Sequence, residues 1–289
     1  MPFDTSQFLL AFVIPGVAAA IAGALWRWPP REEPGLGSFL TGLVLAGGFV
    51  FGCWALGRLE WMPEPFGSGW VPYAAVSAVL VSGFNVLLGG VAGRVLQALL
   101  TLAFVVAAAW LMVRDSASQA DFRWWAVGAL AGAMALTWWT GEFAWRRQNG
   151  RFPVLLSPIL LGMIAVVTMF NLASTSSLEM CSVAVAVMTG GALFAGANQK
   201  SVAKPAMAIF SVAYCGLLYA AYAGLTNAYK SEYVYRNLAT LLAAVSPWLI
   251  LLYGFWRDEE KRLPWKRGLL LTAVIITPAL AGMGLSFLG

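Results

Sequence analysis

The chain has 289 residues, of which 60% are hydrophobic and only 11% are charged, with a net charge of +5 at pH 7. A soluble domain carries about 25% charged residues, so this composition excludes an ordinary soluble protein and indicates a surface that faces lipid. Histidine is absent, which excludes histidine-ligated haem or zinc and a Ser-His-Asp triad.

Apolar runs occupy almost the whole chain, each close to the ~20 residues that a helix needs to cross a bilayer. The first half holds runs at about 7–26, 37–57, 70–92, 95–113 and 124–145. The second half holds runs at about 152–173, 178–197, 203–226, 237–256 and 268–288. The segment before the first run carries Asp4 and no Lys or Arg, so we expect a retained span rather than a signal peptide.

This pattern predicts an all-α fold, a polytopic integral membrane protein with about ten transmembrane helices. The connections between the runs are too short to hold a soluble domain, so we predict a single transmembrane domain over residues 1–289. The lipid bilayer is the expected partner, with other membrane subunits or a homo-oligomer as further candidates.

Lysine and arginine are distributed unevenly among the connections. Counted from the N-terminus, the odd connections hold 13 of these residues and the even ones hold 5. The positive-inside rule then places the odd connections in the cytoplasm and both termini outside, in what we expect to be a bacterial inner membrane. The helices form five hairpins that turn on the cytoplasmic side. Topology explains the positive charge, so we expect no nucleic-acid partner.

Small residues at a spacing of four predict close packing between helices. Such pairs are Gly48/Gly52, Gly89/Gly93, Gly128/Gly132 and Ala192/Gly196. The cysteines lie singly inside apolar runs, without a CxxC pair, which favours small packing residues over a disulfide or metal site. They are Cys53, Cys181 and Cys215.

Two neighbouring predicted spans carry a proline near their middle, Pro247 beside Trp248 and Pro278 in the last run. A proline removes one backbone hydrogen bond and kinks the helix. Two central kinks side by side could open a cavity at mid-membrane, as the broken helices of transporters do. We favour the alternative, in which neighbouring groups absorb an ordinary kink.

Polar side chains inside the runs are few. Glu142 is followed four residues later by Arg146, a spacing that favours a local ion pair over a proton relay. Asn85 is the deepest amide and Gln97 lies early in the fourth run, and each would need a partner across helices. Glu179 follows a run of Ser and Thr and is typical of an acid in the first turn of a helix.

These features predict no catalytic residues, cofactor or metal, and we expect no enzyme. The first functional hypothesis is a transporter or permease for a small neutral or amphiphilic molecule, since the size and span count resemble compact drug/metabolite-type transporters. The alternative is a non-catalytic accessory or scaffold subunit of a larger membrane complex. A polar cavity would favour transport, and the candidate cavity or coupling residues are Asn85, Glu142, Pro247, Trp248 and Pro278.

Overall fold

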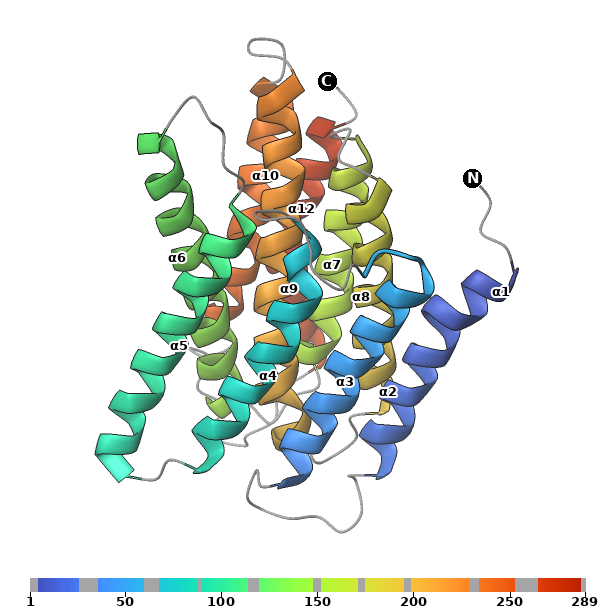
Figure 1. Cartoon of the computed structure of the whole chain (residues 1–289), viewed down its shortest axis with the longest axis vertical. Coiled ribbons are helices and arrows are strands. Elements are labelled where there is room, and N and C mark those ends of the chain that lie inside the picture. The colour runs from blue at the N-terminus through green and yellow to red at the C-terminus, as the bar shows by residue number, and fades with distance from the viewer. Residues whose placement is uncertain are drawn as a thin grey trace.

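The computed structural model describes residues 5–25, 36–59, 68–87, 90–113, 120–147, 152–170, 175–194, 199–228, 234–252 and 265–286. Within these ranges every regular element is helical and there is no strand, so the predicted all-α class is confirmed. The helices run alongside one another as a bundle (Figure 1).

The helical segments follow the apolar runs closely. The first half contains α1 (Thr5–Phe8), a π-helical turn η1 (Leu9–Val13), α2 (Ile14–Leu25), α3 (Leu36–Ala55), a 3₁₀ turn η2 (Ser68–Trp70), α4 (Val71–Leu87), α5 (Gly90–Met112) and α6 (Ala120–Arg147). The second half contains α7 (Phe152–Phe170), α8 (Thr175–Phe194), α9 (Gln199–Ala228), α10 (Val234–Val245), a 3₁₀ segment η3 (Ser246–Ile250) and α12 (Trp265–Ser286). Each predicted run overlaps one of these helical segments.

Four helices in the described ranges are long and apolar enough to cross a membrane. Their apolar stretches are Thr5–Ala22, Ala92–Met112, Pro205–Ala223 and Gly268–Leu285. Shorter apolar stretches occur at Phe39–Ala55, Leu156–Val167, Ser176–Ala192 and Asn237–Ile250. The helical class and the membrane-compatible composition are therefore established, whereas ten spans in five hairpins stay a prediction.

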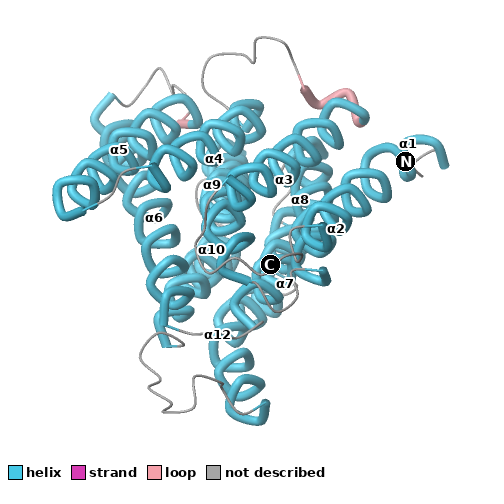
Figure 2. The backbone as a smooth tube through the Cα atoms, turned by 90° about the horizontal axis from the view of Figure 1, so that it is seen from below, coloured by secondary structure: helices cyan, strands magenta, loops and turns pink. Residues whose placement is uncertain are grey.

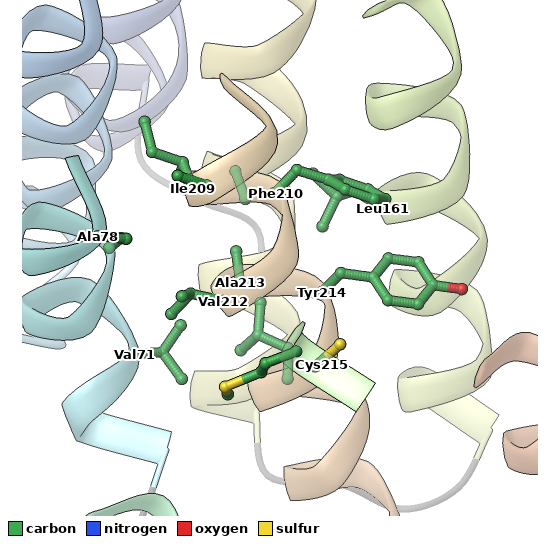
Figure 3. Packing of buried hydrophobic residues seen from close by; sticks show 14 of the residues in the cluster. Val71, Ala78, Leu161, Ile209, Phe210, Val212, Ala213, Tyr214 and Cys215 are labelled. Carbon is green, nitrogen blue, oxygen red and sulfur yellow. The ribbon is translucent and has the colours of Figure 1, made fainter. Parts of the chain in front are cut away.

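Helix α9 is the centre of the bundle. It contacts α3, α4, α5, α6, α7, α8 and α10, and every residue over 205–218 is buried. Phe210 points toward Leu161 of α7, while Ala78 and Val71 of α4 lie on another side of α9 (Figure 3). Seen from below, α5 and α1 lie at opposite flanks of the molecule (Figure 2).

The outer helices bury much less of themselves than α9. The apolar stretch of α9 is 78% buried, whereas those of α5 and α12 are 28% and 22% buried. Most of their exposed residues are apolar, among them Leu99 of α5 and Leu270 of α12. A large exposed apolar surface on a monomer needs lipid or another protein to cover it.

Glycines permit the closest helix contacts. A Cβ added at Gly52 of α3 would lie 2.7 Å from the carbonyl oxygen of Ala11, and one at Gly48 would lie 3.5 Å from Pro15. The predicted packing role of Gly48/Gly52 is therefore confirmed. At Gly190 of α8 an added Cβ would collide with the backbone of Gly16, which packs α8 against α2.

The prediction for Gly128/Gly132 is wrong. Both glycines are exposed, and a Cβ added at either would meet nothing within 4 Å. A spacing of four places two small residues on one face of a helix, but they permit close packing only where another helix lies against that face. Gly89 and Gly196 lie outside the described residues, so their pairs stay predictions. Cys53, Cys181 and Cys215 are buried and form no disulfide.

Candidate functional site

Charged side chains are rare in the part of the chain whose side chains are described. They are Arg58, Arg94, Glu142 and Glu179. They fall into two pairs, one where α3 ends and α8 begins, the other where α5 begins and α6 ends. Figure 1 shows these two places toward opposite ends of the bundle. Each place holds one arginine and one glutamate.

The end of α3 positions Arg58. Gly57 has a φ of 67°, a left-handed conformation that favours glycine. Its N–H donates to the carbonyl of Trp54 at 2.8 Å, and the N–H of Arg58 donates to the carbonyl of Cys53 at 2.8 Å. These two bonds form a Schellman motif, which ends the helix and turns the Arg58 side chain away from its axis.

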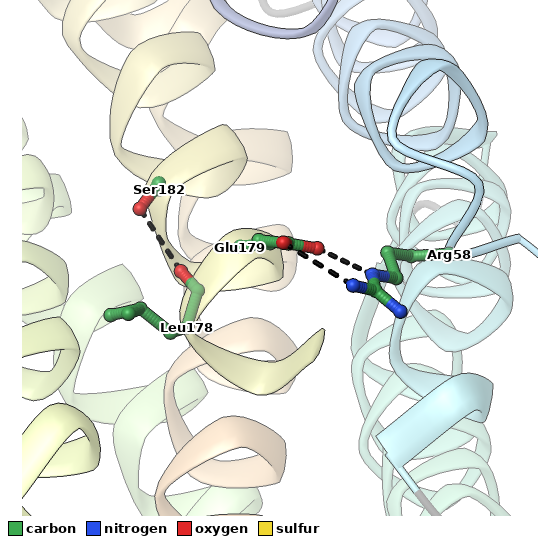
Figure 4. Close-up of polar contacts among 4 residues, drawn as sticks. All are labelled: Arg58, Leu178, Glu179 and Ser182. Atoms are coloured by element: carbon green, nitrogen blue, oxygen red, sulfur yellow. Dashed lines mark hydrogen bonds and ion pairs between the residues drawn. The ribbon is translucent and has the colours of Figure 1, made fainter. Parts of the chain in front are cut away.

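Arg58 and Glu179 form a two-pronged ion pair. The Arg58 Nε donates to one carboxylate oxygen of Glu179, and Nη2 donates to the other at 3.3 Å (Figure 4). The hydrogen bonds to Glu179 raise the pKa of the Arg58 guanidinium above its usual value. The expectation that Glu179 is a first-turn acid is wrong, because it is the fifth residue of α8 and the first turn of that helix holds no acid. Its carboxylate instead binds a cation 121 residues away in the chain.

The second pair lies in a partly open pocket of about 240 Å³ between α5 and α6. Its walls are formed by Arg94, Gln97 and Ala98 from α5 and by Trp139, Glu142 and Phe143 from α6. Within each helix these residues have the spacing i, i+3 and i+4, which places them on one face. The pocket therefore forms where two helix faces meet, and it combines a cation, an amide, a carboxylate and aromatic rings.

Glu142 is held in place within α6. Its side chain is only 8% exposed, and the indole N–H of Trp138 donates to its Oε1 at 3.1 Å. Trp138 is itself buried and packs against Phe104 of α5 with the rings at a steep angle. The Arg146 side chain lies outside the described residues, so the expected Glu142–Arg146 pair stays a prediction.

The helix beginning at Val234 changes character at Pro247. Regular α10 ends at Val245, and the chain continues as the 3₁₀ segment Ser246–Ile250. Pro247 has no N–H, so the carbonyl oxygen of Ala243, four residues earlier, loses its α-helical partner. The hydroxyl of Tyr214 on α9 donates to that oxygen at 2.5 Å.

Buried polar atoms remain at this break. Ser246 Oγ and Trp248 Nε1 are buried and have no hydrogen-bond partner, and the same is true of Asn237 Oδ1 on α10. Such atoms are rare in native interiors because each one costs free energy. They mark the α10–η3 segment as unusual within the described part of the bundle.

The structure places the sequence-predicted residues in three regions. Glu142 lies in the α5–α6 pocket, together with Gln97. Pro247 and Trp248 lie in η3, and Pro278 lies in α12, which packs against both α10 and η3. Asn85 is part of α4, but its side chain is outside the described residues.

Comparison with known proteins leaves these sites to be interpreted from their chemistry. No family model, no curated protein and no solved structure matches the chain. Arg94 and Tyr214 are not among the residues predicted from the sequence. The i, i+3 spacing of Arg94 and Gln97 indicates that the two side chains share a helix face, whereas nothing near Tyr214 in the sequence indicates its distant acceptor.

Proposed function

We propose that the chain is an integral protein of a bacterial inner membrane, with ten spans forming five cytoplasmic-turning hairpins. The agreement between predicted runs and helical segments supports this proposal, as does the 13-to-5 distribution of cations. Helix α1 begins and α12 ends toward the same end of the bundle, as an even number of crossings requires (Figure 1). Arg58 and Glu179, both expected at the outer face, bind each other.

Within that architecture the proposed activity is that of a transporter or permease for a small neutral or amphiphilic molecule. The interruption of α10 at Ser246–Ile250, with buried polar atoms left unsatisfied beside it, is the observation that carries this proposal. A 3₁₀ stretch inside a longer helix often marks a hinge, and broken helices supply polar groups at mid-membrane in transporters.

The second candidate is a non-catalytic accessory subunit, and α5 is the observation that favours it. Val95, Leu99 and Val106 are exposed on this helix, each by more than two-fifths. Such a surface suits lipid, another subunit or a second copy of the chain equally well. An accessory role requires that a protein partner occupy it.

The deciding experiment starts from protein purified in mild detergent. Its unfolding midpoint is measured against a panel of neutral sugars, small amides and single-chain amphiphiles, because a ligand that binds the native state raises Tm with concentration. A compound that raises Tm is then tested for saturable counterflow in proteoliposomes. Transport predicts both effects. Stoichiometric co-purification of another subunit, with no compound raising Tm, would establish the accessory role instead.

The break in α10 is tested with Pro247→Ala, which restores the missing N–H. We expect the ligand to bind this variant while counterflow slows. The matched control is Pro158→Ala, a buried proline inside α7, which should leave counterflow unchanged. Equal counterflow in wild type and Pro247→Ala would exclude the break as the moving element.

A further inference from the structure

The α5–α6 pocket offers one charge of each sign to a ligand. The Arg94 side chain is exposed on α5, while the Glu142 carboxylate is almost buried on α6 and is oriented by Trp138. Gln97 also lines the pocket and can both donate and accept hydrogen bonds. This donor and acceptor set fits a zwitterion, whose anionic and cationic groups are a few bonds apart.

The pocket has the size of a headgroup rather than of a whole lipid. Its volume of about 240 Å³ lies just below the ~300–1,000 Å³ typical of sites that enclose a complete small ligand. The faces that form the pocket continue as an apolar, exposed surface, with Leu102 four residues after Ala98 on α5 and Leu136 three residues before Trp139 on α6. A ligand with a small polar head and long apolar chains would fill the pocket and cover these residues.

The pocket also lies at a suitable depth. Arg94 is four residues after the start of α5 and Glu142 is five residues before the end of α6. At 1.5 Å per residue both lie about 6–8 Å from the helix ends. In the proposed topology this is the cytoplasmic side, at the level where headgroups meet the acyl chains.

We propose that this pocket binds the headgroup of a zwitterionic phospholipid with a primary ammonium, as in phosphatidylethanolamine. The phosphate binds Arg94 and Gln97, the ammonium donates hydrogen bonds to the Glu142 carboxylate, and the acyl chains lie along Leu102 and Leu136. This assignment rests on the membrane placement proposed above. It identifies the class of amphiphile that binds at the surface of α5 and α6.

The charges favour this headgroup over the other common ones. An anionic glycerol headgroup carries the same phosphate but brings no ammonium to the Glu142 carboxylate. A choline headgroup carries a cation but cannot donate a hydrogen bond, whereas an ammonium donates up to three. The carboxylate therefore selects ammonium over trimethylammonium, and the guanidinium holds the phosphate that all these lipids share.

The test is native mass spectrometry of the purified full chain with phosphatidylethanolamine, phosphatidylcholine and phosphatidylglycerol of identical acyl chains. We expect wild type to retain one phosphatidylethanolamine with about tenfold preference over phosphatidylcholine, the ratio that one good charged contact can produce. Glu142→Gln should remove this preference, and Arg94→Gln should weaken the binding of all three lipids. Equal retention of the three lipids by wild type would overturn the assignment.

Glu179→Gln and Arg58→Gln are the matched controls, because they change the same residue types at the other described charge pair. Both should keep the wild-type lipid preference. If Glu142→Gln does not fold, the site is tested by cross-linking a photoactivatable phosphatidylethanolamine to the wild-type protein. Its headgroup should cross-link to α5 and α6. Cross-links confined to other helices would refute the site.

Failure of this assignment is separable from failure of the membrane placement. A carbonate wash of cell membranes tests the placement, because integral proteins stay in the pellet. Release by the wash would overturn both proposals. Retention in the pellet without a preference for phosphatidylethanolamine would overturn the lipid site alone.

Discussion

Tyr214 donates its hydroxyl to the carbonyl oxygen of Ala243, the one backbone acceptor in α10 that Pro247 deprives of its helical donor. Tyr214 is 1% exposed and lies on the central helix α9. Two costs are thus offset together, since an unpaired phenol and an unpaired carbonyl would each be expensive in an apolar interior.

Tyr214→Phe should therefore destabilise the protein by about 1–3 kcal/mol, the usual cost of leaving a buried acceptor unsatisfied. Thermal unfolding in detergent, followed by circular dichroism, measures the change. Pro247→Ala supplies an N–H to Ala243, so in that background the same substitution should cost much less. Additive effects of the two substitutions would show that the hydroxyl does not compensate for the proline.

Glycines at helix contacts should tolerate a methyl group according to what faces them. A Cβ at Gly282 of α12 would lie 2.6 Å from the carbonyl oxygen of Ala239, and backbone cannot move aside cheaply. Gly282→Ala and Gly190→Ala should each lower stability by about 1–3 kcal/mol, as overpacking does. Unfolding midpoints of the purified variants provide the measurement.

Gly132→Ala is the matched control for these two, because the space around Gly132 is open. It should be neutral or stabilise α6 by up to about 1 kcal/mol, the difference in helix propensity between glycine and alanine. A loss of stability in Gly132→Ala equal to that in Gly282→Ala would contradict the packing described for α12 and α10.

The Arg58–Glu179 pair should contribute about 0.5–1 kcal/mol, since Arg58 is 36% exposed and solvent screens the charges. Because the pKa of Arg58 is raised on folding, its part of the contribution is complete below the unfolded pKa. It is lost only as pH rises above the folded value. Stability should therefore not decline through this arginine between neutral pH and pH ~10. A double-mutant cycle of Arg58→Gln and Glu179→Gln measures the coupling.

Orientation in the membrane can be tested by cysteine labelling in intact cells. The three native cysteines are buried, so a membrane-impermeant maleimide should label wild type weakly. Ser68→Cys, near the predicted outer face, should be labelled without breaking the cells. Gly150→Cys, in a predicted cytoplasmic connection, should be labelled only after permeabilisation. The reverse pattern would invert the proposed topology.

The positions of the helices could be predicted from the sequence because a membrane-length apolar run is a local signal. The run predicted at 95–113 coincides with α5, and that at 152–173 with α7, to within a few residues. The number of helices that cross a membrane is a separate question, and four of the described helices are long and apolar enough to do so.

The sites were harder to predict because the residues that interact within them are distant in the sequence. Pro247 indicates that Ala243 loses a donor, but only the packing of α9 against α10 reveals Tyr214. Arg58 and Glu179 bind each other across 121 residues, which no pattern near either residue indicates. Identical spacing in Gly48/Gly52 and Gly128/Gly132 led to opposite outcomes, because only the first pair faces another helix.

The burial of α9 has a consequence for the order of events during synthesis. Of the helices that contact it, α3, α4, α5, α6, α7 and α8 precede it in the chain, and α10 follows. The ribosome therefore synthesises most of the helices that contact α9 before it synthesises α9. A nascent chain that stops before residue 199 lacks the central helix against which they pack, so quality-control proteases would meet an incompletely packed protein until α9 is made.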